Sequence, residues 1–343
     1  MDRRIIRLWQ LFSIILMILT IVGLQFVATV NAKKPEVNYN PVLGFTRILG
    51  TLGGAKYEIF MPDNWNGMLV IGCRGYHDED PEIEEVAAHY LGIIFMTDEK
   101  PEHFAFAWST YGEGGWCIDT GVIRTHQLTE YVIENYNVEG KVFLHGVSMG
   151  GLIACLLGEK YPSLYDGVFD VCGVKDFASL YYHKKAITEL PANPTAIRAY
   201  MNGPPAYLPT SFTSTIPNNK LLQMQQNQIS TLPLMEMECG GTPDTKLKAF
   251  ERRSATCHAD ISIPVMSVIG QLDFGVPLFQ FRMYYDAVEA ASCLDYYRSY
   301  IVEGGQHCDE SVLEAALVYW EIFVDWVVDG VPPVPTPPPP WSP

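Results

Sequence analysis

The sequence predicts an α/β fold in which helices cover both faces of a mostly parallel sheet. Between residues 40 and 330, short apolar runs of strand length alternate with amphipathic stretches of helix length. This alternation is typical of chains in which a helix crosses from each parallel strand to the next. Hydrophobic residues make up 48% of the 343 residues, which is enough for a large core. The length fits one elaborated domain or two smaller ones.

The individual elements follow from these runs. Strands are expected at 45–52, 55–61, 68–72, 104–109, 142–147, 167–172, 264–270 and 296–302. The first two of them should form a hairpin around Gly53-Gly54. Helices are expected at 82–91, 119–136, 149–160, 278–291 and 311–328.

Residues 175–260 interrupt this alternation, and they are too many for a simple crossover between two strands. They are rich in Pro, Asn, Gln, Thr and Met and show only short helical patterns. Ligands bind at the carboxyl edge of such sheets, so we expect an inserted cap over that edge. A second, independent domain is the alternative, but the scattered apolar residues of the segment would form a poor core alone.

Both ends of the chain differ from its middle. Residues 1–32 contain three arginines, an apolar run at 8–30 and a small-x-small ending, which together predict a signal peptide or a retained signal anchor. An anchor would tether the protein to a membrane, and either form would place residues 40–330 outside the cytoplasm. Residues 331–343 form a Pro-rich tail that favours extended polyproline II.

Charge argues against one class of partner, and the cysteines bear on metal sites and disulfides. Lys and Arg total 23 against 39 Asp and Glu, and the net charge of −16 argues against nucleic-acid binding. Eight cysteines suit an exported protein, and the absence of any CxxC pair argues against a zinc ribbon. Cys155 and Cys172 lie in apolar runs and are expected to be buried thiols. The candidate disulfides are Cys239 with Cys257 and Cys293 with Cys308.

The strongest catalytic signal is Gly146-Val147-Ser148-Met149-Gly150-Gly151. A buried strand precedes it and a helix follows, which is the context that a G-x-S-x-G motif requires. The two flanking glycines relieve crowding in a tight turn that exposes Ser148. The turn also places the Met149 N–H at a helix N-terminus, where it can stabilise an oxyanion.

A nucleophilic serine needs a base, and the base needs an orienting acid. Asp273 follows the strand at 264–270, and His307 follows the strand at 296–302. Both therefore fall at the same sheet edge as Ser148, and the three residues are the predicted catalytic triad. Asp176, after the strand at 167–172, is the alternative acid. His145 lies within a buried strand and is expected to be a core histidine.

The loop after the strand at 68–72 is expected to complete the site. There Gly75 would let the backbone approach the substrate, and the Tyr76 N–H would complete the oxyanion hole with Met149. Arg74 could contact a substrate carboxylate or pair with the acidic residues at 78–85. Trp108 and Trp116 belong to an aromatic cluster that either lines an acyl or aryl pocket or simply fills the strand core. No metal ligands or phosphate-binding loop are needed, and hydrolysis without a cofactor is expected.

These residues resemble the α/β-hydrolase superfamily over the span 40–330. Strings such as Pro62-Asp63-Asn64-Trp65-Asn66-Gly67, and Gly305-Gln306-His307-Cys308 near the end, are similar to those of secreted bacterial and archaeal esterase-like hydrolases. Tannase and fungal-type feruloyl esterases resemble the chain in part, and they join a Cys beside the serine to a Cys beside the histidine. Here Cys308 follows His307, but Val147 precedes Ser148, so that bridge is absent.

Four classes of function remain after these arguments. The leading one is an exported serine esterase acting on small-molecule or polymeric carboxylic esters, with aryl, feruloyl and polyester substrates all open. A serine peptidase of the prolyl-oligopeptidase or aminopeptidase type would need an Arg or an acidic cluster for a substrate terminus. Acyl transfer or lyase chemistry and a non-catalytic binding module are the others, and an intact triad argues against the last.

Overall fold

The computed structural model describes residues 35–40, 44–85, 103–202, 213–214, 216–238 and 257–335. The expected export segment at 1–32, Cys239 and most of the Pro-rich tail lie outside these residues. Of the helix expected at 82–91, the described part is a short 3-10 helix, η1 (Ile83–Glu85). Among the described residues, no helix is both long enough and apolar enough to cross a bilayer.

One nine-stranded mixed sheet organises the described residues, in the order β1-β2-β3-β5-β4-β6-β7-β8-β9. From β5 to β9 in this order neighbouring strands are parallel, and β1, β2 and β3 add an antiparallel edge. The strands are β1 (Glu36–Asn40), β2 (Phe45–Leu52), β3 (Ala55–Pro62), β4 (Trp65–Cys73), β5 (His103–Ser109), β6 (Val142–Val147), β7 (Gly167–Val171), β8 (Val265–Gly270) and β9 (Tyr297–Val302). The predicted fold class is therefore confirmed.

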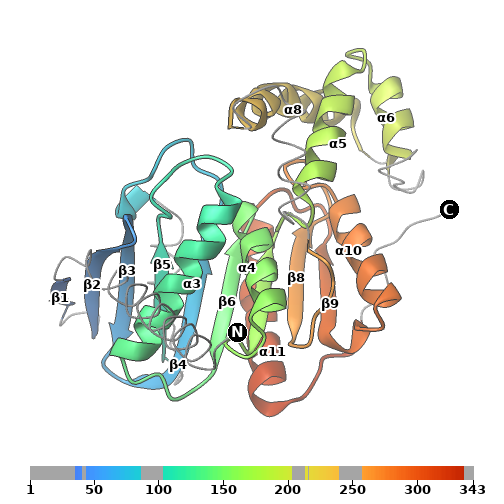
Figure 1. Cartoon of the computed structure of the whole chain (residues 1–343). Helices are drawn as coiled ribbons and strands as arrows, with labels where there is room; N and C mark the ends of the chain where they lie inside the picture. Colours follow the sequence, from blue (N-terminus) through green and yellow to red (C-terminus); the bar gives the residue numbers. More distant parts are fainter. Residues whose placement is uncertain are drawn as a thin grey trace, which may run out of the picture.

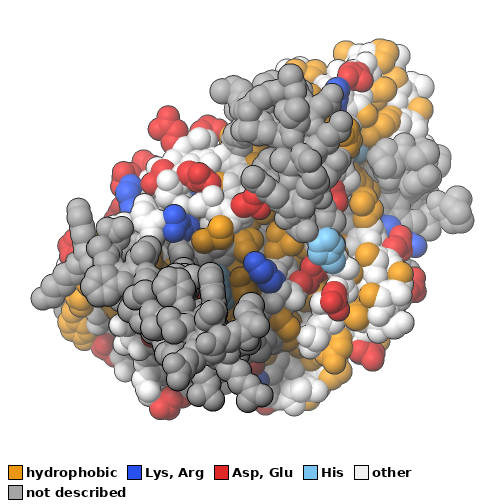
Figure 2. All heavy atoms as spheres, viewed as in Figure 1, with side chains coloured by type: hydrophobic (Ala, Val, Ile, Leu, Met, Phe, Trp, Pro, Cys, Tyr) orange, Lys and Arg blue, Asp and Glu red, His pale blue; other side chains and the backbone are white. Residues whose placement is uncertain are grey.

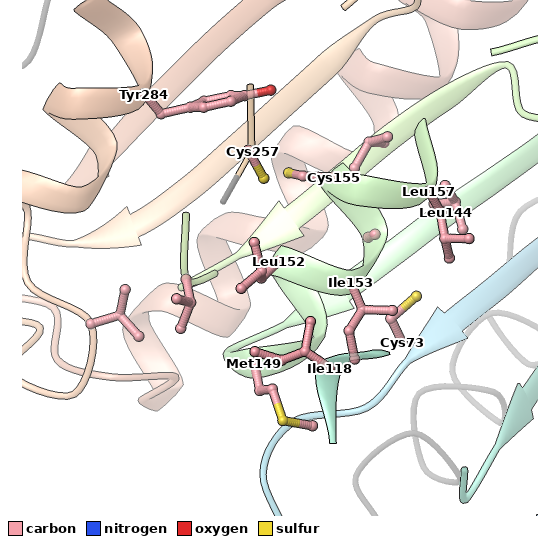
Figure 3. Packing of buried hydrophobic residues seen from close by; sticks show 14 of the residues in the cluster. Cys73, Ile118, Leu144, Met149, Leu152, Ile153, Cys155, Leu157, Cys257 and Tyr284 are labelled. Atoms are coloured by element: carbon pink, nitrogen blue, oxygen red, sulfur yellow. The ribbon is translucent and has the colours of Figure 1, made fainter. Parts of the chain in front are cut away.

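Helices cover both faces of the sheet (Figure 1). On one face lie α3 (Ile118–Asn135), α4 (Met149–Lys160) and α10 (Phe279–Ala290), and on the other lies α11 (Glu310–Asp329). Successive residues of β6 point to opposite faces of the sheet. Leu144 packs in the core under α4, and Phe143 contacts α11 on the other face. The Phe143 ring lies 5.6 Å from that of Trp320 on α11. Figure 3 shows the α4 layer, with Leu152, Ile153 and Leu157 pointing into the apolar core.

Three helices of the cap lie together at the edge of the sheet where α5 follows β7 (Figure 1). They are α5 (Phe177–Glu189), α6 (Pro194–Asn202) and α8 (Asn218–Glu238). The prediction of only short helical patterns was wrong for α8, which has 21 residues. Buried residues recur along it at helical spacing: Leu221, Met224, Gln228, Leu232 and Met235. Its many Gln and Asn residues and Pro233 concealed this spacing in the sequence.

The helices α5, α6 and α8 pack on one another, and their apolar residues are continuous with the core beside the sheet. Phe177, Ile187 and Leu221 belong to the same continuous apolar cluster as Leu69 and Leu144 of the central strands. The scattered apolar residues of this segment therefore find their partners on the sheet domain and on one another.

The predicted disulfide between Cys293 and Cys308 is absent, because both are free thiols. Cys293 precedes β9 and Cys308 follows it, so a strand of roughly 20 Å separates their positions. Cys257 is also a free thiol, and Cys155 and Cys172 are buried as expected.

Candidate active site

Ser148 lies on a sharp turn between β6 and α4, with a φ of 57°. A side chain at Gly146 would collide with the main chain of Gly150, and one at Gly150 would collide with that of Cys73. Both glycines are therefore required for the chain to pass through this turn. Neighbouring backbone holds it in place, since the Ser148 N–H donates to Val171 O and its carbonyl accepts from the Val174 N–H, both at 3.0 Å.

The structure brings the three predicted triad residues into one hydrogen-bonded chain. Ser148 Oγ lies 3.0 Å from His307 Nε2, and His307 Nδ1 lies 2.8 Å from Asp273 Oδ2. The geometry suits Oγ–H donating to Nε2 while Nδ1–H donates to the carboxylate. Asp273 Oδ1 also accepts the Val276 N–H at 2.8 Å, which fixes the carboxylate in its loop.

Electrostatics favour the protonated form of His307. Burial alone lowers the pKa of the imidazole, but the charge of Asp273 and its hydrogen bond outweigh burial, so the pKa is raised above its ordinary value. Asp273 itself is 2% exposed. An imidazolium formed during a reaction would therefore be stabilised at this position.

The other titratable candidates have structural roles. Asp176, the alternative acid, caps α5 by accepting the Ser179 N–H. His145 is buried in β6 as predicted, and burial lowers its pKa to about 4. Neither side chain contributes to the hydrogen-bonded chain at Ser148.

Both predicted oxyanion residues lie beside Ser148. Met149 is the first residue of α4, so its N–H has no acceptor within the helix. Gly75 packs against the nucleophile, since a Cβ added there would lie 3.4 Å from Ser148 Cβ. Tyr76 follows Gly75 directly, and its ring lies 5.6 Å from that of Trp116.

Arg74, which the sequence suggested as a substrate contact, is engaged with the protein's own main chain. Its guanidinium is buried and donates to Thr110 O at 2.8 and 2.9 Å, to Glu113 O at 2.6 Å and to Gly75 O at 3.0 Å. It also lies over the Tyr111 ring, 4.4 Å from the centroid. Arg74 therefore braces the oxyanion loop against the loop that follows β5.

Trp108 is likewise not a substrate residue. It is fully buried on β5, and its Nε1–H donates to Glu58 Oε2 at 2.8 Å. Glu58 is its cross-strand partner on β3 and also pairs with Arg47. Trp116 is only partly buried and contacts both Tyr76 and Phe177, so it remains the aromatic candidate beside the oxyanion loop.

Replacing Arg74 by methionine tests this reassignment. The change leaves the buried Thr110 carbonyl and the partly buried carbonyls of Gly75 and Glu113 without these donors, so the free energy of unfolding should fall by roughly 2–5 kcal/mol. The ratio of KM values for esters with and without a carboxylate should stay the same. Urea denaturation and steady-state kinetics measure the two quantities. Arg282→Met, which removes a surface pair with Asp286, is the matched control. A selective rise in KM for the carboxylate ester would restore Arg74 as a substrate contact.

A cap residue that the sequence did not reveal supports the loop of the acid. Gln228 on α8 donates to Phe274 O, beside Asp273, and accepts from the Nζ of Lys184 on α5 at 2.6 Å. Burial lowers the pKa of Lys184 to about 8. The only sequence signal for Gln228 is its place in the apolar repeat of α8.

A small recess lies at this junction. Its lining includes Ile187, Met201 and Met224 from the cap, and Asp273 and Phe274 from the acid loop. Ser148 and His307 do not line it. The recess therefore adjoins the acid, on the cap side of the triad.

No protein-family model matches the sequence, and no curated protein is detectably similar to it. Its structure is similar to that of an esterase from Aspergillus oryzae, with a TM-score of 0.60 and 15% identity over 90% of this chain and 89% of the other. It is also similar to feruloyl esterase B from the same organism, with a TM-score of 0.56 and 15% identity over 90% of each chain. For an esterase from Pyrococcus furiosus the TM-score is 0.52, with 14% identity over 84% of this chain and 93% of the other. Identities this low show a shared fold only, so the activity has to be argued from the residues of the site. The sheet, its strand order and these neighbours together show that the chain has the α/β-hydrolase fold.

Proposed function

We propose that this protein is a serine hydrolase that cleaves carboxylic esters through an acyl-enzyme intermediate. The observation that carries the proposal is the continuous hydrogen-bonded chain from Ser148 through His307 to Asp273. A serine nucleophile, a base and a buried acid, linked in this order, are the groups that formation of an acyl-enzyme requires.

In the first half of the reaction, Ser148 Oγ attacks the ester carbonyl while its proton passes to His307 Nε2. The Met149 and Tyr76 N–H groups stabilise the negative charge on the carbonyl oxygen. Collapse of the tetrahedral species breaks the bond to the alcohol, which leaves with the proton from His307. Asp273 holds the imidazole in place and stabilises its charged form throughout.

Water completes the second half. His307 takes a proton from the water as its oxygen attacks the acyl carbon, and then returns that proton to Ser148 Oγ. The acid product and the free enzyme result. These residues supply every proton transfer, so the proposed reaction requires no cofactor or metal.

The surroundings of the triad favour an ester over a peptide. A peptidase of the prolyl-oligopeptidase or aminopeptidase type needs an Arg or acidic groups to bind a substrate terminus. Arg74 is fully engaged with main-chain oxygens, and Glu82 and Glu84 are paired with Lys56 and Arg47. Acidic side chains are spread over the visible face, in keeping with the net charge of −16, and disfavour strongly anionic substrates (Figure 2).

The experiment that tests the proposal compares turnover of p-nitrophenyl esters over a series of acyl chains with turnover of aminoacyl p-nitroanilides. We expect hydrolysis of at least the short acyl esters, with the anilides much poorer. Including a feruloyl ester and a polyester film separates the aryl and polymer substrates. Faster turnover of an anilide than of every ester would establish the peptidase instead.

The pH dependence of kcat/KM provides a second check. Only neutral His307 can accept the Ser148 proton, so activity should fall as the pH falls through the imidazole pKa. Because Asp273 raises that pKa, the midpoint of the acid limb should lie above the ordinary histidine value of about 6.5. A midpoint below 6.5, or activity that declines with rising pH over this interval, would contradict His307 as the base.

We also propose that the catalytic part acts outside the cytoplasm, on the strength of the arginines and apolar run in residues 1–32. N-terminal sequencing of protein from the native host, with fractionation, tests this. A start near Lys33 supports a cleaved signal peptide, and a full-length chain in the membrane fraction supports an anchor. A full-length chain in the cytoplasm would overturn both.

A further inference from the structure

Two cysteines meet beside the catalytic base. The Cys308 N–H donates to Cys172 Sγ at 3.3 Å, and the two sulfur atoms lie within 4.8 Å of each other and of a His307 ring nitrogen. Cys172 is fully buried, whereas Cys308 is partly exposed. The pair therefore combines close approach with one sulfur that reagents in solution can reach.

The backbone at both cysteines is unusual in the same way. Cys172 and Cys308 each have a φ of 51°, in the left-handed region that glycine occupies without cost. A cysteine there costs free energy, which must be offset by what surrounds it. Two such cysteines facing each other indicate that the side chains themselves matter at these positions.

The pair also joins two parts of the triad. Cys172 lies between Val171 and Val174, the residues whose main-chain groups bracket Ser148. Cys308 directly follows His307. A covalent bond between the two sulfur atoms would link the backbone that holds the nucleophile to the backbone that holds the base.

We propose that Cys172 and Cys308 form a redox pair that closes to a disulfide by exchange with a low-molecular-mass disulfide such as oxidised glutathione. The Cys308 thiolate attacks one sulfur of the oxidant, forms a mixed disulfide and releases the first thiol. Cys172, as its thiolate, then attacks Cys308 Sγ and releases the second thiol. The protein thus loses two electrons and two protons, which the oxidant gains as it becomes two thiols.

Cys308 acts first because of its exposure. The hydrogen bond with Cys308 and burial raise the pKa of Cys172, so Cys172 is the poorer first nucleophile. It acts second because its sulfur lies beside that of Cys308, where the mixed disulfide forms. This bridge would differ from one between residues flanking the serine and the histidine, because Cys172 comes from the end of β7.

A second thiol pair provides an internal comparison. The sulfur atoms of Cys155 and Cys257 face each other in Figure 3, and Lys175 Nζ donates to Cys155 Sγ at 3.2 Å. Their side chains are 1% and 6% exposed, so neither offers an oxidant the access that Cys308 does. Oxidation under mild conditions should therefore select Cys172 and Cys308.

The test incubates the full chain in glutathione buffers of increasing oxidised fraction, quenches with acid, alkylates free thiols and maps the peptides by mass. We expect a crosslinked peptide containing Cys172 and Cys308, two hydrogens lighter than its reduced parts, before any crosslink between Cys155 and Cys257. In Cys172→Ser, Cys308 should instead accumulate as a glutathione adduct. Alkylation of both cysteines at every ratio, or a stable glutathione adduct on Cys308 in the unmodified protein, would overturn the proposal.

The effect of the disulfide on stability is measured separately. At a fixed urea concentration within the transition, the crosslinked protein should have a folded-to-unfolded ratio at least about tenfold above that of the reduced protein. Cys172→Ser and Cys308→Ser should show no such difference between oxidising and reducing buffers. Equal ratios for crosslinked and reduced protein would show that the bond forms without tying the site together.

Discussion

Replacement of Ser148 by alanine is expected to lower kcat for an activated ester by a factor of about 10⁶, because the acyl-enzyme can no longer form. The residual rate would come from binding and from the oxyanion donors, which the substitution leaves in place. Labelling by a fluorophosphonate probe should fall from one equivalent to none. Intact-protein mass spectrometry and progress curves measure the two effects.

Ser163→Ala is the matched control. Ser163 is exposed in the connection between α4 and β7, at the opposite end of α4 from Ser148, so its loss should change neither labelling nor kcat. Unchanged urea denaturation of Ser148→Ala would show that the loss is chemical rather than structural. Probe attachment that persists in Ser148→Ala would assign the nucleophile to another residue.

The sheet was predictable because its strands are short apolar runs, and from β6 to β9 each strand lies beside the next one in the chain. The bounds expected for β2, β6 and α4 agree with the structure. Periodicity identified the strands but did not give their order: β5 lies between β3 and β4, although β4 precedes it in the chain. That order depends on packing between distant segments, which a local pattern does not encode.

The same limit applies to two residues that the sequence suggested as substrate contacts. Trp108 contacts Glu58 only because β5 pairs with β3. The sequence around neither residue indicates that a buried acid accepts a hydrogen bond from this indole. Arg74 finds its acceptors at Thr110 and Glu113, in a loop whose position relative to β4 depends on the whole sheet. From the sequence alone, Trp108 could line a pocket or fill the strand core, and Arg74 could contact a substrate or pair with nearby acids.

The close approach of the three predicted triad residues could be foreseen for the opposite reason. Each of its residues sits at the carboxyl end of a parallel strand, and such ends meet at one edge whatever the strand order. The glycines around Ser148 added a local steric requirement that few other sequences satisfy. Gln228 and Cys172 act through tertiary contacts with Phe274 and Cys308, so only the three-dimensional structure reveals them.

Asp273→Asn is expected to lower kcat by a factor of about 10⁴ while the fold persists. Asparagine keeps the shape and can still accept the Val276 N–H, but it carries no charge to stabilise the imidazolium. Its amide can also donate to Nδ1, which would place the His307 proton on Nε2 and block acceptance of the Ser148 proton. Steady-state kinetics across pH measure the loss.

The residual activity of this variant carries further information. Without the carboxylate, burial is the largest remaining influence on His307 and lowers its pKa, so the acid limb should move to lower pH than in the unmodified protein. Asp176→Asn is the matched control, since the Asp176 side chain caps α5 and its loss should leave kcat and the acid limb in place. A large fall in kcat for Asp176→Asn together with a small one for Asp273→Asn would transfer the role of the acid to Asp176. An unchanged acid limb in Asp273→Asn would show that the measured titration belongs to a group other than His307.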